Sequence, residues 1–279
     1  PVRLWPKDAS PEPQQGCIMR AYNELTPATL MRLIGTPQCP VIIDVSIDED
    51  FEASPFLIPT ATRQAHKNIA SIVPDLIGKQ VVVICQKGKK LSHGAAAVLR
   101  AHGIDAQVLA GGNAAWAEAA YPRVPSKNIQ PNLWVTRHRP KIDRIACPWL
   151  IRRFVNPNAT FLYVPPAEVL DVAERFGGTA FDIADTFWSH RGPLCTFDTM
   201  VSEFGLSHPA IDAVALIVRA ADTYSHNLAP QAAGLLAFSV GMSRSHRDDL
   251  SQLEASMPLY DALYRWARDG QDESHDWVE

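Results

Sequence analysis

The stretch VVVICQKGKKLSHGAAAVL, residues 81–99, decides the fold of the first part of this chain. Four consecutive β-branched residues predict a buried strand, the polar segment with its glycine predicts a loop, and the alanine-rich run predicts a helix after His93. Cys85 therefore follows the carboxyl end of a strand and lies close to a helix N-terminus. Open α/β sheets bind their ligands at this position.

The residues after Cys85 have the properties of an anion-binding loop. Backbone N–H groups of a glycine-containing loop and of a helix N-terminus have no intrahelical partner and can hold an anion. The same groups lower the pKa of a nearby thiol, and the thiolate is the nucleophilic form of cysteine. We predict a reactive Cys85 in an anion cradle formed by Gln86, Lys87, Gly88, Lys89, Lys90, Leu91 and Ser92.

Strands and helices alternate on both sides of this stretch. Residues 41–45 and 106–109 predict two further buried strands, the first with Asp44 near its end. Residues 26–35 predict a helix, with Thr26 as its N-cap. Elements of this size in alternation imply an α/β fold with a parallel sheet covered on both faces.

The strand ending in aspartate, the C-x-x-G loop, the alanine-rich helix and the pattern L-x-G-G-x-x-x-W together resemble the rhodanese-like (sulfurtransferase) family. The resemblance covers residues 22–121 and is carried by Asp44, Cys85, Gly88, residues 95–99, Leu109, Gly111, Gly112 and Trp116. It implies that the cysteine takes a sulfane sulfur from a donor such as thiosulfate and passes it, through a persulfide, to a thiol acceptor without a cofactor. Loop amides and lysines would stabilise the thiolate and the departing sulfite-like oxyanion.

The loop departs from the family pattern in two ways. Lys90 stands where many members have an arginine, so a bidentate grip on an oxyanion is not expected. The loop is one residue longer than the commonest version, with Leu91 where a serine is usual and Ser92 after it. Longer loops of this fold resemble those of rhodanese-fold phosphatases and arsenate reductases. A phosphatase or an oxyanion reductase is therefore the alternative chemistry, ranked after sulfur transfer because no arginine ends the loop.

Cys85, Asp44 and His93 each have a second interpretation. A cysteine at a strand end is often an inert, small apolar side chain. Asp44 is a supporting residue that we expect to pin a turn or cap a loop rather than to act as an acid. His93 is a supporting residue that either assists proton transfer or faces solvent in the first turn of the helix.

A proline-containing segment separates this domain from a second one. Residues 121–131 contain three prolines and few apolar side chains, as a semi-rigid linker does, and a length of 279 residues favours two domains over one. We therefore divide the chain into an extended arm (1–20), a rhodanese-like domain (21–122), the linker (123–132), a second domain (133–270) and an acidic tail (271–279).

The second domain is predicted to contain a small sheet followed by helices, an α+β and mostly helical arrangement. Strands are expected at 133–137, 159–164 and 180–183, and helices at 142–154, 167–176, 196–204, 209–221, 228–240 and 248–268, with a kink or break at Pro148 and Pro258. The runs DRIACPWLIRRF (143–154), FDI (181–183), SHRG (189–192), ADT (221–223) and LYDALY (259–264) resemble the chromate-resistance (ChrB-type C-terminal) domain family. The resemblance implies a link to chromate or oxidative stress.

Polar residues at the ends of these elements are the site candidates of the second domain: Asp143, Arg144, His190, Arg191, Asp198 and Asp222. A histidine with two or three carboxylates suits iron or manganese. An anion site built from Arg144, Arg152, Arg191 and His190 would instead suit chromate or a phosphate. A plain buried ion pair uses the same groups, so these interpretations stay open. The basic segment 137–153 lacks a helix-turn-helix with interleaved aromatics, so DNA binding is not expected.

Composition limits the function classes further. With 47% hydrophobic and 20% charged residues and a net charge of -4, the chain is an ordinary globular protein with no general affinity for nucleic acid or anionic membranes. The cysteines, Cys17, Cys39, Cys85, Cys147 and Cys195, include no C-x-x-C pair, which fits a reducing cytoplasm. The longest apolar stretch, 232–242, is too short to span a bilayer.

The sequence thus predicts a cytoplasmic, sulfurtransferase-like protein that moves sulfane sulfur through a Cys85 persulfide and is linked to resistance to chromate or another oxyanion. Its partners would be a small anionic sulfur donor, a thiol acceptor and chromate or another oxyanion. The alternative is a chromate- or metal-responsive sensor or regulator without turnover.

Overall fold

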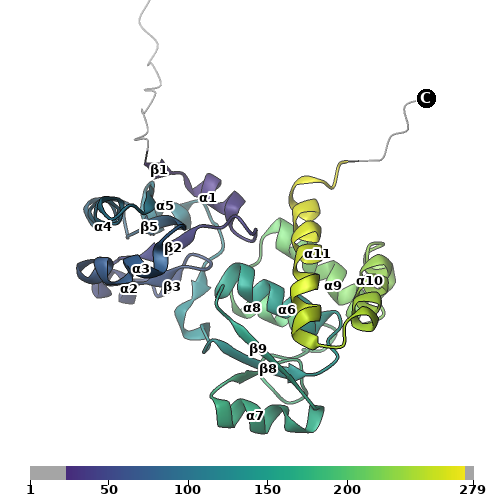
Figure 1. Ribbon diagram of the computed structural model, residues 1–279. Helices are drawn as coiled ribbons and strands as arrows, with labels where there is room; N and C mark the ends of the chain where they lie inside the picture. Colours follow the sequence, from purple (N-terminus) through teal and green to yellow (C-terminus); the bar gives the residue numbers. More distant parts are fainter. Residues whose placement is uncertain (1–22, 274–279) are drawn as a thin grey trace, which may run out of the picture.

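The computed structural model describes residues 23–273, which form two lobes side by side (Figure 1). The purple-to-teal lobe in Figure 1 holds the elements from β1 to α5, and the teal-to-yellow lobe holds those from β8 to α11. The predicted arm, 1–20, lies outside the described residues, as do residues 274–279 of the predicted acidic tail. No helix within residues 23–273 has both the length and the apolar character needed to cross a membrane.

The first domain is built around a five-stranded parallel sheet with the order β1-β6-β5-β2-β4, as expected for an α/β fold. Strand β5 is central, with Val83 opposite Ile43 of β2 and Val108 of β6. In chain order the elements are β1 (Glu24–Leu25), α1 (Pro27–Leu33), β2 (Val41–Asp44), α2 (Asp48–Ala53), β3 (Phe56–Leu57), β4 (Thr62–Arg63), the 3-10 helix η1 (His66–Ile72), α3 (Val73–Leu76), β5 (Gln80–Ile84), α4 (Lys90–Ala101), β6 (Asp105–Leu109) and α5 (Gly112–Glu118).

Strand β5 is apolar throughout its buried length because both faces of the sheet are covered. Val81 and Val83 pack in one apolar layer with residues of α4 and η1. Val82 and Ile84 point to the opposite layer, which holds residues of α1 and α5. The alternation of side chains along the strand thus explains why four β-branched residues follow one another.

Helix α4 begins about one turn earlier than predicted. It starts at Lys90 and not after His93, so Lys90, Leu91 and Ser92 of the predicted loop lie in its first turn. Ser92 is buried there, and its hydroxyl donates to the Lys89 carbonyl at 3.0 Å. The usual N-cap signal is absent, since the Lys89 side chain makes no capping hydrogen bond. The early start therefore depends on packing that sequence patterns do not reveal.

The segment predicted as a linker contacts both domains. Within residues 123–132, β7 (Val124–Pro125) pairs antiparallel with β3, and the 3-10 helix η2 (Ser126–Asn128) follows. The Asn128 side-chain amide donates to the Glu203 carbonyl at 2.5 Å. These contacts attach the segment to the first domain at one end and to the second at the other.

The second domain joins a three-stranded parallel sheet of order β10-β8-β9 to a group of helices, and its mostly helical character agrees with the prediction. Its elements are β8 (Leu133–Arg137), α6 (Asp143–Leu150), the π-helix η3 (Ile151–Val155), β9 (Thr160–Val164), the 3-10 helix η4 (Pro166–Glu168), α7 (Val169–Phe176), β10 (Thr179–Ala180), α8 (Thr196–Glu203), α9 (Pro209–Asp222), the 3-10 helix η5 (His226–Leu228), α10 (Ala232–Ser245) and α11 (Asp249–Asp269).

Two elements of the second domain differ from their predicted ranges. The strand expected at 180–183 is β10, which ends at Ala180, because Asp182 has φ +51° and leaves the extended conformation. The helix expected at 228–240 starts at Ala232 and runs to Ser245. Leu228 belongs to the separate turn η5.

Pro148 and Pro258 lie within helices without ending them. Pro148 sits in α6 and lacks the N–H that would reach the Arg144 carbonyl. The Tyr163 hydroxyl donates to this carbonyl at 2.9 Å instead, so the backbone acceptor keeps a partner. Helix α11 also continues through Pro258, and the predicted break there is wrong.

The two domains share one hydrophobic core. Leu30 of α1 belongs to the same buried cluster as Trp149 of α6 and Phe154 of η3. Gly35 follows α1 with φ +81°, and a Cβ at this position would lie 2.3 Å from Phe154 Cζ, so a larger residue would separate the two surfaces. The Thr60 N–H also donates to the Phe154 carbonyl at 3.1 Å. These contacts make the domain boundary a packed interface.

Candidate functional site

Cys85 lies directly after β5, at the carboxyl edge of the sheet, with a 5% exposed side chain. Its Sγ donates to Ser92 Oγ at 3.2 Å. Its carbonyl accepts hydrogen bonds from the N–H groups of Gly88, at 3.3 Å, and Asn113, at 3.1 Å. The residue is thus held between the first turn of α4 and the beginning of α5.

Gly88 and Gly112 allow three backbone segments to meet at Cys85. Both glycines have positive φ, +59° and +60°. A Cβ on Gly112 would lie 2.0 Å from the Cys85 carbonyl oxygen, and a Cβ on Gly88 would lie 2.5 Å from the Leu109 carbonyl oxygen. Close packing of the loop against α5 therefore requires the glycine of C-x-x-G and the second glycine of the G-G pair.

The loop after Cys85 presents hydrogen-bond donors and positive charge. Within residues 23–273, no acceptor is found for the backbone N–H groups of Gln86, Lys87 or residues 89–92. Lys87, Lys89 and Lys90 are exposed, and none of the ion pairs between described residues involves them. Free amides and unpaired ammonium groups on one loop are what an anion would bind.

Asp44 is the last residue of β2, and His93 lies in α4. Asp44 is fully buried, with Oδ1 accepting from the Ser46 N–H at 2.8 Å and Oδ2 accepting from the Asn113 side-chain amide at 2.9 Å. It ties the end of β2 to the start of α5. The His93 side chain is 46% exposed, and its Nε2 lies 3.3 Å from Glu24 Oε1 of β1.

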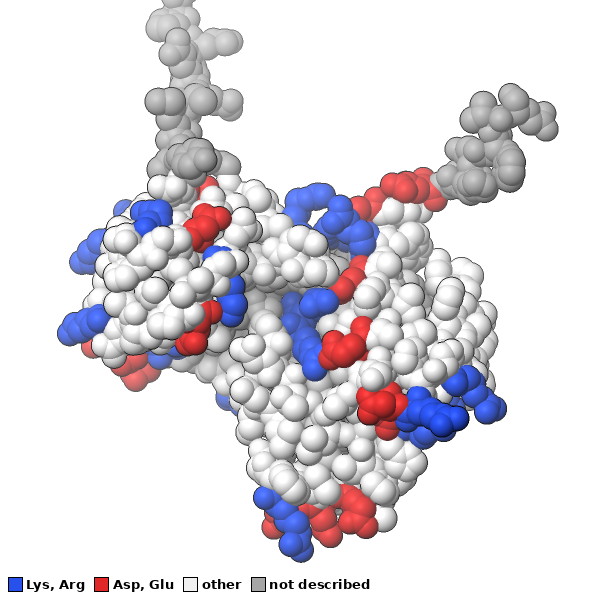
Figure 2. All heavy atoms as spheres, viewed as in Figure 1, with Lys and Arg blue, Asp and Glu red and all other residues white. Residues whose placement is uncertain are grey.

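A different thiol, Cys39, faces a cavity between the two lobes. This cavity has a volume of about 490 Å³, and basic residues from both domains, Lys79, Arg152 and Arg153, contribute to its lining. Figure 2 shows the molecule hollowed between the lobes, with basic side chains at the hollow. Burial raises the pKa of the Cys39 thiol to about 11. Cys39 is therefore a poor nucleophile at neutral pH.

Alkylation of Cys39 by iodoacetamide should accelerate about tenfold for each pH unit between roughly pH 8 and pH 10. Only the thiolate reacts, and a thiol with a pKa of about 11 remains mostly protonated over this range. Peptide mass spectrometry at each pH would follow Cys39 separately from the other cysteines. A rate that has already levelled off near pH 9 would contradict the raised pKa.

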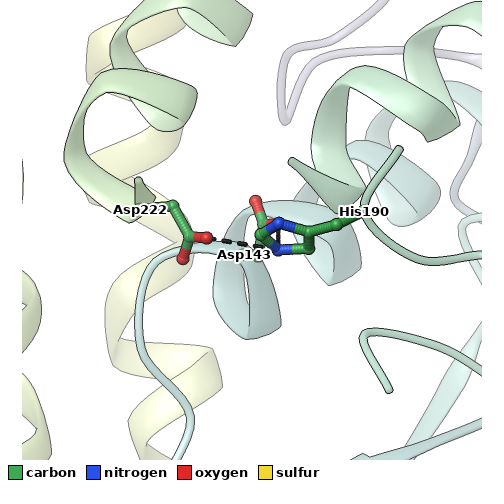
Figure 3. Close-up of side chains that lie close together, drawn as sticks. All are labelled: Asp143, His190 and Asp222. Carbon is green, nitrogen blue, oxygen red and sulfur yellow. Dashed lines mark ion pairs between the residues drawn. The ribbon is translucent and has the colours of Figure 1, made fainter. Parts of the chain in front are cut away.

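In the second domain, four residues from separate segments form a group that we call the acidic cluster: Asp143, Asp182, His190 and Asp222. Asp143 is the first residue of α6 and Asp222 the last of α9. Figure 3 shows Asp143, His190 and Asp222 directed toward one another. His190 Nε2 lies 3.3 Å from Asp143 Oδ2, 3.3 Å from Asp222 Oδ2 and 3.5 Å from Asp182 Oδ1.

Asp143 and Asp182 are the buried members of the acidic cluster. Thr196, at the start of α8, donates its N–H to Asp143 Oδ2 at 2.6 Å and its hydroxyl to Asp182 Oδ1 at 2.8 Å. Arg137 and Arg144 pair with Asp182 Oδ2 at 3.0 and 3.3 Å. Asp182 is thus fixed on both oxygens, whereas Asp143 Oδ1 is buried without a hydrogen-bond partner among the described residues.

The electrostatics of the acidic cluster follow from this burial. Burial raises the pKa of Asp143 to about 6. Hydrogen bonds with Asp143, Asp182 and Asp222 raise the pKa of His190 to about 12. Burial opposes the ionisation of Asp182, but hydrogen bonds from His190 and Thr196 and the two arginines hold its pKa below the usual value. Protonated His190 and the two arginines are together the counter-ions of the three carboxylates.

Arg191, Asp198 and Arg152 lie outside the acidic cluster. Each pairs with a different opposite charge: Arg191 with Glu203, Asp198 with Arg219 and Arg152 with Glu254. Asp198 Oδ2 also accepts from the Cys195 N–H at 3.1 Å at the start of α8. The structure therefore brings together Asp143, His190 and Asp222, with Arg144 linked to them through Asp182, and does not form the anion site of Arg144, Arg152, Arg191 and His190.

Asp182 and Arg137 also belong to this site, although their sequence context does not mark them as site residues. Asp182 lies in the run FDI, which reads as a short strand and gives no sign of its positive φ. Arg137 ends a predicted strand and reads as a solvated charge. The one sequence signal for Asp182 is an acidic residue between two apolar residues, at a place where a strand must end.

Two parts of the chain match known families. Residues 26–119 match the rhodanese-like domain family, and residues 134–267 match the family described as ChrB, C-terminal domain. Over 85 residues the chain is 40% identical to Protein ChrB of Cupriavidus metallidurans. This alignment covers 30% of the chain and 25% of that protein, so the chain spans about a quarter of its curated relative.

Solved structures with similar folds include a rhodanese-related protein from Thermoplasma volcanium and a thiosulfate sulfurtransferase from Pseudomonas aeruginosa. The first is 24% identical, with 37% of this chain and 98% of that chain covered and a TM-score of 0.32. The second is 22% identical, with 38% and 20% covered and a TM-score of 0.32. By its two family matches, the chain joins a rhodanese-like domain at residues 26–119 to a ChrB C-terminal domain at residues 134–267.

Proposed function

We propose that the rhodanese-like domain moves sulfane sulfur from a thiosulfate-type donor to a thiol acceptor through a persulfide on Cys85. The observation that carries this proposal is the position of Cys85 at a strand end, before a loop with free amides and three unpaired lysines. The match to the rhodanese-like family supports it, and the match to the ChrB C-terminal domain favours a role in resistance to chromate or another oxyanion.

The proposed reaction has two nucleophilic steps. The Cys85 thiolate attacks the outer sulfur of thiosulfate, a new S–S bond forms, and the sulfur–sulfur bond of the donor breaks with its electron pair leaving on sulfite. An acceptor thiolate, or cyanide in an assay, then attacks the outer sulfur of the persulfide and regenerates the Cys85 thiolate.

Several groups at the loop suit these steps. The Ser92 hydroxyl lies 3.2 Å from Cys85 Sγ and can donate to the thiolate by turning away from the Lys89 carbonyl, its acceptor in the structure. The free N–H groups and lysines of the loop offset the negative charge that collects on the donor and on the leaving sulfite.

Mass spectrometry after incubation with thiosulfate tests the proposal. We expect the intact protein to gain the mass of one sulfur atom, with the added sulfur on the peptide that contains Cys85, and cyanide to remove it as thiocyanate. Protein that gains no sulfur, or gains it on another cysteine, contradicts the proposal.

Charge on the loop should matter more for donor binding than for the chemical step. Replacing Lys87, Lys89 and Lys90 together by glutamine should raise the KM for thiosulfate about tenfold, since each exposed ammonium contributes roughly 1 kcal/mol or less. The matched control is Lys79→Gln, because this exposed lysine precedes β5 and lies at the opposite end of the strand from Cys85. Equal KM values for all three proteins would exclude the lysines from donor binding.

A sensor without turnover is the second candidate function, and the burial of Cys85 favours it. A thiol that is 5% exposed and bonded to Ser92 reacts with fewer acceptors than an open one. A sensor would bind chromate tightly or lose its Cys85 thiol stoichiometrically, without repeated release of sulfite from thiosulfate. Measuring sulfite per mole of protein separates the two functions.

A further inference from the structure

The acidic cluster takes no part in the proposed chemistry of Cys85. We propose that Asp143, His190 and Asp222 bind one divalent transition-metal ion of the manganese or iron class. The proposal rests on the geometry, the burial and the charges of the ChrB C-terminal domain and does not depend on sulfur transfer.

The donor atoms have the spacing of a metal-binding site. One ligand atom from each of Asp143, His190 and Asp222 lies within 4.8 Å of the others. The two contacts to His190 Nε2 are 3.3 Å long. Atoms bound about 2 Å from one ion lie about 3–4 Å from each other. A small inward movement of the side chains in Figure 3 would place all three on one ion.

Hydrogen bonds alone do not satisfy these groups. Nε2 of a histidine carries at most one hydrogen, but three carboxylate oxygens lie within 3.5 Å of His190 Nε2. Asp143, with a 1% exposed side chain, has an Oδ1 that no donor in the described chain reaches. A buried carboxylate oxygen without a partner is unusual in a folded protein, and a cation in the cluster supplies the missing interaction.

The charges nearby are compatible with a cation. The carboxylates of Asp143, Asp182 and Asp222 face two guanidinium groups, those of Arg137 and Arg144, and the imidazole of His190. A histidine that binds a metal must be neutral, so a bound ion would replace the proton of His190 as the third positive group. Both carboxylate oxygens of Asp182 already have partners, in Arg137, Arg144 and Thr196. Asp182 therefore orients its neighbours rather than acting as a ligand.

The chemistry of the ligands selects the class of ion. Two carboxylate oxygens with one imidazole nitrogen suit manganese or iron better than the soft metals that prefer thiolates. The three residues fill half of an octahedron, and the remaining positions are available to water or a small oxyanion. The His190 side chain is 41% exposed, so an ion can enter from its side while the carboxylate of Asp143 stays buried.

Titration with Mn²⁺ tests the proposal, because free Mn²⁺ gives an electron paramagnetic resonance signal that disappears on binding. Full-length protein stripped with a chelator should bind one Mn²⁺ per chain, and binding should raise the midpoint of thermal unfolding. Asp222→Asn and His190→Ala should each weaken binding at least about tenfold. Cys85→Ser should bind Mn²⁺ as the wild type does.

Asp212→Asn is the matched control, since Asp212 is an exposed acid on the same helix, α9. This variant should keep the wild-type affinity and the wild-type shift in unfolding midpoint. Absence of Mn²⁺ binding by the wild type, or equal affinity of the wild type, Asp222→Asn and His190→Ala, would overturn the proposal. Two variants are used so that the misfolding of one does not decide the test. The unfolding curve recorded without metal would reveal a misfolded variant.

Discussion

Cys85→Ser should lower the rate of sulfite release from thiosulfate, with cyanide as acceptor, at least about a thousandfold. A serine hydroxyl is not ionised at neutral pH and cannot carry sulfane sulfur as a persulfide. The substitution keeps the size of a side chain that contacts Ser92 Oγ, so the loop should stay folded. The remaining rate would come from the loop amides and lysines that bind the donor.

Cys39→Ser is the control for this experiment. The Cys39 thiol lies 3.7 Å from Thr60 Oγ1 at the interface of the domains, and burial raises its pKa to about 11. Its replacement should leave the rate within about a factor of two of the wild type. If Cys85→Ser retained a rate within about tenfold of the wild type, the sulfur would not travel through Cys85.

Gly112→Ala should lower the free energy of unfolding by about 2–5 kcal/mol. Gly112 has φ +60°, which costs an L-residue roughly 1–2 kcal/mol, and overpacking adds about 1–3 kcal/mol. The added Cβ would lie 2.0 Å from the Cys85 carbonyl oxygen and 2.4 Å from the Gly88 backbone nitrogen. Because neither backbone atom can rotate away, α5 must shift from the cysteine loop, and the persulfide yield should fall too.

Gly103→Ala separates the two contributions. Gly103 also has a positive φ, +79°, but a Cβ there would meet nothing within 4 Å. Gly103→Ala should lower the free energy of unfolding only by the cost of the positive φ, roughly 1–2 kcal/mol, and should leave the persulfide yield unchanged. Urea unfolding of both variants gives the comparison. If Gly112→Ala and Gly103→Ala lost the same free energy of unfolding, the close approach of Gly112 to Cys85 would contribute nothing to the loss.

The first domain was largely predictable because its signals are local. Each signal depends on a few neighbouring residues. The strand at 81–84 follows from side-chain alternation, the start of α1 from the hydrogen bond that the Thr29 N–H donates to the Thr26 cap at 3.1 Å, and the pattern L-x-G-G from the positive φ of its glycines. Strands of two residues, such as β1 and β4, show no periodicity and were missed. The start of α4 was misplaced because the bond from Ser92 to Lys89, not a cap, marks it.

The candidate site of the second domain was predictable only in part. Asp143, His190 and Asp222 were recognised as polar residues at element ends, but the same reasoning selected Arg191 and Asp198, which pair elsewhere. Residue type and spacing do not distinguish a residue that points into the cluster from one that forms a separate ion pair. That distinction depends on how α6, α8 and α9 pack.

The sequence by itself determined the strand, loop and helix around Cys85, the helices of the second half and the two families, because hydrogen bonding and apolar periodicity within a few residues specify them. Only the tertiary structure decided that Asp143, Asp182, His190 and Asp222 meet, and that Leu30 and Phe154 share a core across the domains. These contacts join residues far apart in the chain, and the packing of whole helices, rather than any local pattern, sets their distances.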